Sequence, residues 1–438
     1  MKRLFFLIIF LVPFFNWGQK IDKVHIEEYD LPNGLHVILH KDVNEPNVIV
    51  GTKYHVGSKN EDAGKTGFAH FFEHLLFHGT KNIPQGELEN IIFNAGGYCN
   101  AYTNYDVTYY YQLLPAHEYK LGLWVESERM LHPIITQKGI DREREIVKEE
   151  KRMRYDNKPL GNSYFYLMSK LFTNDTYGHN MIGSMEDLDR ASVGDFEAFF
   201  KKFYVPNNAC LVVSGNIDIE DTKKWVGLYF TDIPRGEKIK RPKKIKKTSG
   251  LDHYTEMDVK GLRNQSIEIG YPIMSQSSAD APVMQIITSI LSGNSDFSYF
   301  DNNLKAEQDT VIKRLNASSS FWEKVGTLSV KAEITTKESE AYTLQRIEEQ
   351  LELLKTKSVD PMVLERVKKQ YISTYIDIFY DAQTFADKVT DYYHLHKNTS
   401  DIKSLISDIE KVTSSDIQRV AKKYLNINNR IVISYHPE

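Results

Sequence analysis

A basic stretch near the middle of the chain does most to limit how this sequence can fold. Residues 233–251 read IPRGEKIKRPKKIKKTSGL, a segment too hydrophilic and too aperiodic for a buried helix or strand. It divides a chain of 438 residues, longer than one hydrophobic core usually organises, into nearly equal parts. We therefore expect an exposed linker between two domains, 20–232 and 252–438. Contact of the basic run with anionic lipid or a partner is the alternative.

The two parts repeat one order of expected elements, which predicts a duplicated domain. Each begins with strands and a helix: strands at 35–39 and 47–56 with a helix at 66–77 in the first part, and a strand at 264–271 with a helix at 281–291 in the second. Further helices are expected at 121–131, 137–155, 193–203, 337–355 and 361–378, and closing strands at 209–214 and 430–435. This pattern favours an α+β fold of two homologous domains, each a mainly antiparallel sheet packed with helices.

The first 19 residues are typical of a secretory signal peptide. Lys2 and Arg3 precede an apolar run over 4–15, which is short for a membrane span, and small or polar residues follow. We expect an exported, periplasmic protein; an uncleaved N-terminal anchor is the alternative, because no good A-x-A cleavage site is present. With only Cys99 and Cys210 in the chain, disulfides are not the main source of stability. A net charge of −4 gives no indication of nucleic-acid binding.

The spacing His70-x-x-Glu73-His74 is the feature most suggestive of chemistry. Residues four apart lie on one face of a helix, so both imidazoles can reach one metal ion with Glu73 beside them. Zinc accepts two imidazoles and a carboxylate, lowers the pKa of a bound water and polarises a carbonyl group, while a neighbouring carboxylate takes the proton. Chance spacing is the alternative. The apolar neighbours of this motif make burial of three such groups costly unless a metal compensates them.

A third protein ligand should be an acidic residue on another element. The expected helix over 141–150 carries several acids, and spacing alone does not choose among them. Glu143 and Glu150 are seven residues apart and therefore share a face, whereas Glu145 and Glu149 face elsewhere. A solvated, charged helix face remains the alternative for most of these residues.

Several blocks around the motif resemble the pitrilysin and insulinase family, which includes mitochondrial processing peptidase. The H-x-x-E-H order is its inverted-zincin motif. The similar blocks cover most of residues 30–218 and are 56–58, 67–74 with 79–80, 96–97 with 100–110, 143–150, 182–188 and 204–215.

The resemblance implies a zinc metalloendopeptidase with one Zn²⁺ per subunit and Glu73 as the general base. It identifies Glu150 as the third ligand beside His70 and His74, and Glu143 as a residue that supports the ligands from behind. It also implies that two such halves enclose a chamber, in which peptide is held as an added edge strand near Asn100 and Ala101. Without the resemblance, Asn100 and Ala101 are plain turn and strand residues.

One stretch of the second domain departs from the family. Self-sufficient members carry an Arg and a Tyr in an LR...GLAY-like block, whereas residues 300–313 here read FDNNLKAEQDTVIK. Lys305 stands near the position of the Arg, and the Gly and Tyr are absent; lysine retains the charge but not the planar fork. We therefore expect a dimer, in which a zinc-less paralogue supplies the missing Arg and Tyr.

Two other functions compete with the peptidase. A non-catalytic scaffold or binding subunit of a processing-peptidase-like complex is the first, because the family contains such members. The complete set of His70, Glu73, His74 and Glu150 argues against it, since an inactive copy has no physical reason to retain four costly polar groups. A metal-dependent hydrolase of other substrates is the second, and zinc chemistry alone does not distinguish it.

Overall fold

The first half of the chain is built on a six-stranded sheet. The computed structural model describes residues 25–172, 176–241, 245, 252–292, 298–301, 311–379 and 381–438. The expected signal peptide, residues 1–19, lies outside them. The strands of this sheet are β1 (Ile26–Asp30), β2 (His36–Lys41), β3 (Asn47–Tyr54), β4 (Tyr98–Thr103), β5 (Thr108–Pro115) and β6 (Ala209–Gly215). Their order is β1-β2-β6-β3-β5-β4, so β4 forms one edge, and every pairing except β2 with β6 is antiparallel.

The second half repeats this arrangement with five strands. They are β7 (Asp252–Val259), β8 (Gln265–Ile273), β9 (Ile312–Phe321), β10 (Gly326–Ile334) and β11 (Arg430–Pro437), in the order β7-β11-β8-β10-β9. Its single parallel pair, β7 with β11, corresponds to β2 with β6, and its edge strand β9 corresponds to β4. The α+β class with two homologous domains is thereby confirmed.

Helices pack against both sheets. Those of the first half are α2 (Phe68–Leu75), α3 (Leu88–Asn94), α4 (Tyr119–Leu131), α5 (Gln137–Lys151), α6 (Ser163–Leu171), α7 (Met185–Arg190), α8 (Val193–Phe203) and α9 (Ile219–Phe230). Those of the second half are α10 (Ala281–Ser292), α11 (Glu340–Thr356), α12 (Pro361–Ile378), α13 (Ala382–His396), α14 (Ser404–Glu410) and α15 (Ser414–Tyr424).

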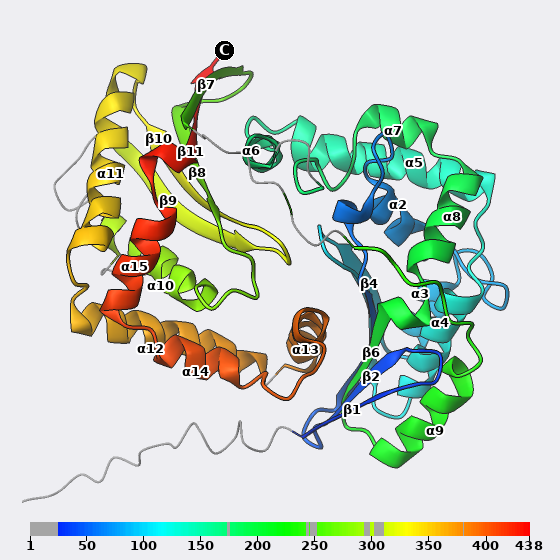
Figure 1. Ribbon diagram of the computed structural model, residues 1–438. Helices are drawn as coiled ribbons and strands as arrows, with labels where there is room; N and C mark the ends of the chain where they lie inside the picture. The colour runs from blue at the N-terminus through cyan, green and yellow to red at the C-terminus, as the bar shows by residue number, and fades with distance from the viewer. Residues whose placement is uncertain are drawn as a thin grey trace, which may run out of the picture.

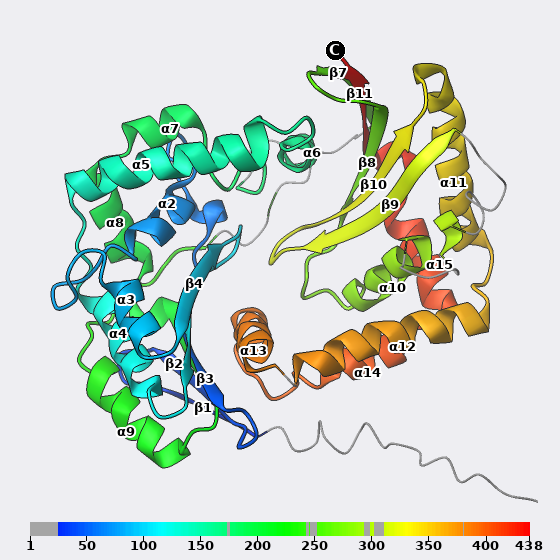
Figure 2. The ribbon, with the colours of Figure 1, turned by 180° about the vertical axis from the view of Figure 1, so that it is seen from behind.

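The halves exchange one helix each. Figures 1 and 2 show α6 beside the sheet of the second half and α13 beside the sheet of the first. Leu167 and Leu171 of α6 pack with Ile433 of β11, and Phe385 of α13 packs with Val212 of β6. Because β6 is buried on both faces, its sequence ACLVVSG is a nearly continuous apolar run, without the alternation of a half-exposed strand.

Buried ion pairs join the halves beside α13. Lys53 of β3 is fully buried, and its Nζ lies 2.8 Å from Asp387 Oδ1 and 2.6 Å from Asp391 Oδ1. Burial lowers the pKa of Lys53, but the two carboxylates outweigh that effect and raise it overall. His55 Nε2 lies 2.7 Å from Glu323 Oε2, a second link between the halves. Removal of one partner from such a pair is costly, because the other charge remains buried.

Some element boundaries differ from the sequence-based expectation. The helix expected over 66–77 spans only Phe68–Leu75, because Gly67 precedes it with a left-handed φ of 85°. The helix expected over 137–155 ends at Lys151 and continues as a π-helical turn over Arg152–Asp156. The described part of the expected linker is attached to the first half: Ile233 is buried, and the Gly236 N–H donates to Asn207 Oδ1 at 2.7 Å. Residues 242–244 and 246–251 of that linker lie outside the described part.

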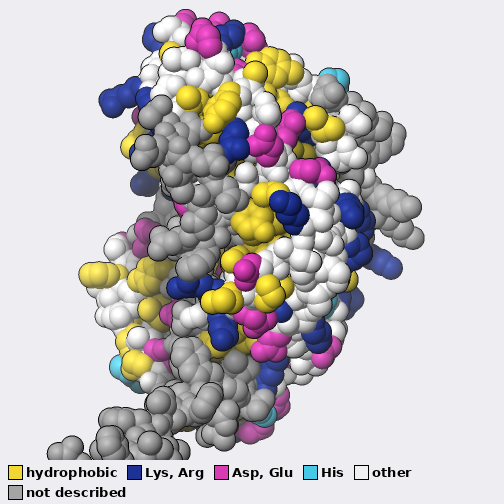
Figure 3. Space-filling view, turned by 90° about the vertical axis from the view of Figure 1, so that its left-hand side faces the viewer, with side chains coloured by type: hydrophobic (Ala, Val, Ile, Leu, Met, Phe, Trp, Pro, Cys, Tyr) yellow, Lys and Arg dark blue, Asp and Glu magenta, His cyan; other side chains and the backbone are white. Residues whose placement is uncertain are grey.

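The outer surface of the second half is mixed in character. Figure 3 shows acidic, basic and apolar side chains interspersed on that side of the molecule. Within the described residues, no helix combines the length and the apolarity that a transmembrane span requires. Cys99 and Cys210 are both free thiols.

Candidate metal centre

Helix α2 separates its apolar residues from its chemically reactive ones. Its buried residues pack into the core of the first half and are Phe68, Ala69, Phe71, Phe72 and Leu75. The opposite side carries His70, Glu73 and His74, which line a pocket. Since the apolar side can bury itself in only one orientation, packing of the phenylalanines determines where the three polar groups point.

Contacts at the start of α2 fix its position. A Cβ atom on Gly67 would lie 2.5 Å from the Ile182 carbonyl oxygen, so only glycine permits this close approach. The buried carboxylate of Glu61 accepts hydrogen bonds from the N–H groups of Gly67 at 2.9 Å and Ala69 at 2.8 Å. These N–H groups have no partner within the helix, and an anion at this end also suits the helix dipole.

Helix α5 supplies two carboxylates on the side that faces α2. Thr136 caps its start by accepting from the Gly139 N–H at 3.1 Å. Glu143 is buried and Glu150 is half-buried, and both line the same pocket as α2. Glu145 on the next face is exposed, as its spacing predicts.

Three potential ligand atoms converge between these helices. Glu150 Oε2 lies 3.3 Å from His74 Nε2 and 3.6 Å from His70 Nε2. In the described residues, His70, His74 and Glu150 are the one group of three or more His, Cys, Asp or Glu side chains close enough to share a metal ion.

These separations fit zinc. Tetrahedral zinc with ligands at about 2.0–2.1 Å places neighbouring ligand atoms about 3.3–3.4 Å apart. Two imidazole nitrogens and one carboxylate oxygen are also the donor set of many catalytic zinc sites, with the fourth position open. In addition, Glu73 Oε2 is buried with no hydrogen-bond partner among the described residues, which is costly unless the site contains a further polar partner.

The pocket shifts the pKa values of His70, Glu73 and His74 in different directions. Burial lowers the pKa of His70 to about 4 and raises the pKa of Glu73 to about 7. Burial also lowers the pKa of His74, but hydrogen bonds to Glu143 and Glu150 outweigh it and raise that pKa to about 9. His74 must lose this proton before it can bind a metal ion, so metal binding by the free chain should strengthen as pH rises toward 9.

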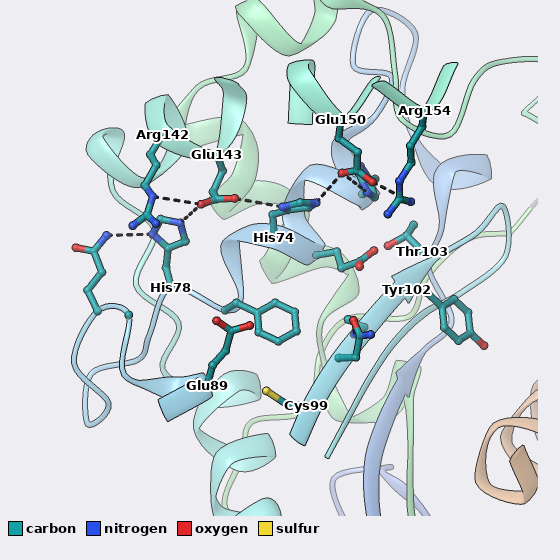
Figure 4. A pocket seen from close by; sticks show the side chains of 17 residues that line it. His74, His78, Glu89, Cys99, Tyr102, Thr103, Arg142, Glu143, Glu150 and Arg154 are labelled. Atoms are coloured by element: carbon teal, nitrogen blue, oxygen red, sulfur yellow. Dashed lines mark hydrogen bonds and ion pairs between the residues drawn. The ribbon is translucent and has the colours of Figure 1, made fainter. Parts of the chain in front are cut away.

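Glu143 connects two histidines behind the site. Its Oε2 lies 3.2 Å from His74 Nδ1 and its Oε1 lies 2.6 Å from His78 Nε2, while Gln85 Nε2 lies 3.0 Å from His78 Nδ1 (Figure 4). Burial raises the pKa of Glu143, but the two histidines outweigh it and lower that pKa to about 2. A permanently ionised carboxylate at His74 Nδ1 orients the ring so that Nε2 faces Glu150.

The pocket continues from the ligands to strand β4. Its volume is about 460 Å³, and residues 99–103 of β4 form one wall. Asn100 is exposed and Ala101 half-buried, and the Asn100 side chain accepts from the Ala101 N–H at 2.8 Å. The outer edge of β4 has no strand partner among the described residues. Both residues therefore lie at an edge that can pair with an extended peptide.

Sequence reasoning missed three residues of this pocket. His78 lies four residues after His74, so the same helical spacing that identified the first two histidines could have indicated it. Thr103 acts on Glu73 through a hydrogen bond that lowers the pKa of that carboxyl. Arg154 lies in the π-helical turn with its Nη1 2.9 Å from Glu150 Oε1, and no spacing rule indicates a residue placed by such a turn. Lys305 lies outside the described residues.

Replacing Glu150 by alanine should weaken zinc binding by more than about 100-fold, because even partners behind the ligands contribute 10–100-fold. Glu149→Ala is the matched control: Glu149 is the adjacent exposed acid, and its carboxylate contacts Arg152 at 2.9 Å. Competition with a chromophoric chelator measures both affinities. Equal affinities in the two variants would exclude Glu150 as a ligand.

Known proteins resemble the chain over about half of its length or nearly all of it. The zinc protease PqqE of Helicobacter pylori is 27% identical over 436 residues, which cover 94% of this chain and 93% of that protein. The beta subunit of mitochondrial-processing peptidase of Blastocladiella emersonii is 30% identical over 206 residues, 47% of this chain and 44% of that protein. The crystal structure of a protease from Helicobacter pylori has the same fold, with a TM-score of 0.87 at 23% identity over 94% of this chain and 100% of that one.

Two family models match consecutive parts of the sequence. Residues 36–184 match the insulinase domain of peptidase family M16, and residues 190–371 match the domain described as the M16 inactive domain. The boundary between the matches falls after the metal centre, so all four residues of that centre lie in the first. Together with the zinc proteases among its relatives, these matches support a metallopeptidase, and the chain belongs to peptidase family M16.

Proposed function

We propose that this chain is a zinc metalloendopeptidase that hydrolyses peptides or unfolded polypeptides. The observation that carries the proposal is the convergence of His70, His74 and Glu150 on one point, with the Glu73 carboxylate in the same pocket. When bound, zinc would acidify a water molecule and polarise the scissile carbonyl group. His70, His74 and Glu150 would hold the ion, one per chain.

Glu73 is the proposed general base. A base works best when its pKa lies near the operating pH, and burial raises the pKa of Glu73 to about 7. Glu73 lines the same pocket as the three ligands, and one of its oxygens has no partner among the described residues, so it can take a proton from the attacking water and later donate it to the leaving amine. The hydrogen bond from Thr103 of β4 favours the ionised form of Glu73.

Strand β4 is the proposed site of substrate pairing. An extended peptide that adds to the free edge of β4 uses main-chain groups, which all peptides share, so many sequences can bind. Asn100 and Ala101 would contact the peptide next to the scissile bond. Because the substrate must be extended and unpaired where it adds to β4, this mode favours short or unfolded polypeptides.

A second subunit completes the proposed enzyme. Residues 300–313 lack the Gly and Tyr of the family block, and the match of residues 190–371 is to a domain described as inactive. We infer that a zinc-less partner of the same fold closes the chamber and supplies an Arg and a Tyr that stabilise the bound substrate. The exported, periplasmic location expected from residues 1–19 belongs to the same proposal.

A scaffold role is the less favoured alternative. A scaffold would gain nothing from keeping four polar groups around one point in an otherwise apolar region. All four groups are present, and Glu143 and His78 additionally support His74. Such support behind the ligands is expected of a working metal site.

Glu73→Gln should abolish peptidase activity and preserve zinc binding, because glutamine retains the shape but cannot take a proton. The expected fall in kcat/KM is on the order of 10²–10⁴ for loss of a general base. Glu145→Gln makes the same change on the exposed face of α5 and should leave activity unaltered. The assay is cleavage of an unstructured peptide together with zinc content. Undiminished turnover by Glu73→Gln would remove Glu73 as the base.

The purified chain alone should cleave the same peptide at least about 100-fold more slowly than a mixture with a zinc-less paralogue, since one oxyanion donor is worth 10²–10³ in kcat. Addition of that paralogue carrying alanine in place of its Arg and Tyr serves as the control and should give no acceleration. Full activity of the chain without any second polypeptide would contradict the two-subunit proposal.

A further inference from the structure

A second pocket lies where the expected linker meets the end of α13, beside the end of β3 and the start of β6. Its volume is about 390 Å³. The linker contributes Arg235, Gly236, Lys238, Ile239 and Arg241 to one wall, residues 207–209 form another, and the end of α13 with Tyr393 and Lys397 forms the third. None of these residues lines the metal pocket.

The charged side chains that line this pocket are all basic. Four basic side chains line it, Arg235, Lys238, Arg241 and Lys397, and no described acidic side chain does. Among the residues that the structure describes, none of the four forms an ion pair with a carboxylate. Glu323 and Asp106 act on Arg241, and Glu323 also acts on Lys397, but both carboxylates already pair with Lys59, and Glu323 also pairs with His55. The positive charge of the pocket is therefore only partly compensated.

Arg241 forms the inner part of the cluster and has unused hydrogen-bonding capacity. Its Nη2 donates to the His55 carbonyl oxygen at 2.7 Å and to the Asn208 side chain. Its Nη1 is buried and has no partner among the described residues. A buried donor without a partner is costly unless a ligand satisfies it.

Lys397 is held in place at a conformational cost. It ends α13 with a φ of 61°, the one left-handed φ among the described non-glycine residues. Partial desolvation of the side chain and the neighbouring Arg241 lower the pKa of Lys397, although the residue is exposed at the rim, so this position disfavours the cation. Its Nζ also lies 5.3 Å from the centre of the Tyr393 ring. A bound anion would stabilise the charged form of Lys397.

A solvated cationic surface is the competing interpretation, because Arg235, Lys238 and Lys397 are exposed at the rim. It does not explain Arg241, whose buried Nη1 has no partner among the described residues. Nor does it explain why the Arg235 guanidinium packs directly against the turn at Gly34. A Cβ atom on Gly34 would lie 2.4 Å from Arg235 Nη1.

We propose that this pocket binds a soluble phosphate-bearing anion, such as a di- or triphosphate, between the linker and α13. Arginine pairs with phosphate oxygens through two parallel hydrogen bonds, and lysine adds a point charge. If each oxygen needs about the 30 Å³ of a water molecule, one phosphate occupies on the order of 120 Å³. The pocket therefore has room for more than one phosphoryl group. The anion would fasten α13 of the second half to the first half.

Isothermal titration calorimetry of the full chain with phosphate, pyrophosphate and triphosphate tests this site. Affinity should rise with ligand charge and fall as sodium chloride is added, because salt screens these partly exposed cations. Triphosphate should also raise the Tm, since it binds only the folded state. No heat and no Tm shift with triphosphate at low salt would overturn the proposal.

A matched pair of double variants separates the pocket from general electrostatic attraction. Arg235→Gln with Lys238→Gln should weaken triphosphate binding about 10-fold or more. Lys201→Gln with Lys224→Gln removes the same charge from exposed positions on α8 and α9 and should leave affinity unchanged. Equal weakening by both pairs would overturn the proposal. Sedimentation with phosphatidic-acid vesicles shows whether the phosphate belongs to a lipid or to a soluble anion. If the chain co-sediments with the vesicles and the Arg235→Gln, Lys238→Gln variant does not, the ligand is a lipid headgroup, which would overturn the proposal. If the chain binds triphosphate but does not co-sediment, the ligand is a soluble anion, as proposed.

Discussion

Burial of the apolar side of α2 is the constraint on which the rest of the metal centre depends. Phe71 and Phe72 are fully buried, and Gly67 brings the start of the helix against residue 182. A rotation of α2 would expose this apolar surface, at roughly 1.5–3 kcal/mol for each phenylalanine. The helix therefore holds His70, Glu73 and His74 toward α5. The two carboxylates of α5 reach them simply because they lie on the same face of that helix.

The second half is attached close to the wall that would bind substrate. The hydroxyl of Tyr102, on β4, donates to Asp387 of α13, and the same carboxylate holds the buried Lys53. Tyr102 lies between the metal pocket and a neighbouring pocket at the interface of the halves. The position of the edge strand thus depends on α13, the helix that the second half contributes to the first-half sheet.

Sequence alone predicted the duplication, the α+β class and the motif of His70, Glu73 and His74, because each has a local signature. The periodicity of apolar residues indicated the strands and helices. The four-residue spacing of His70 and His74 indicated that both lie on one face of a helix. Glu150 needed the family resemblance, since α5 carries several acids and only the tertiary position of α5 against α2 selects one. Spacing predicted neither the exchange of α6 and α13 nor the π-helical turn that places Arg154, because both depend on contacts between distant segments. The basic segment after residue 233 was expected to be exposed, and its described part packs against the first half because Asn207 and Asn208 hold it.

The central claim is that two imidazoles and one carboxylate hold zinc beside Glu73. X-ray absorption at the zinc edge of the zinc-loaded chain measures the ligand types and distances directly. We predict nitrogen and oxygen ligands alone, at about 2.0–2.1 Å, with the scattering pattern of two imidazoles. Cys99 lines the same pocket, so a sulfur ligand at about 2.3 Å would contradict the account, as would a shell of six oxygens without imidazole.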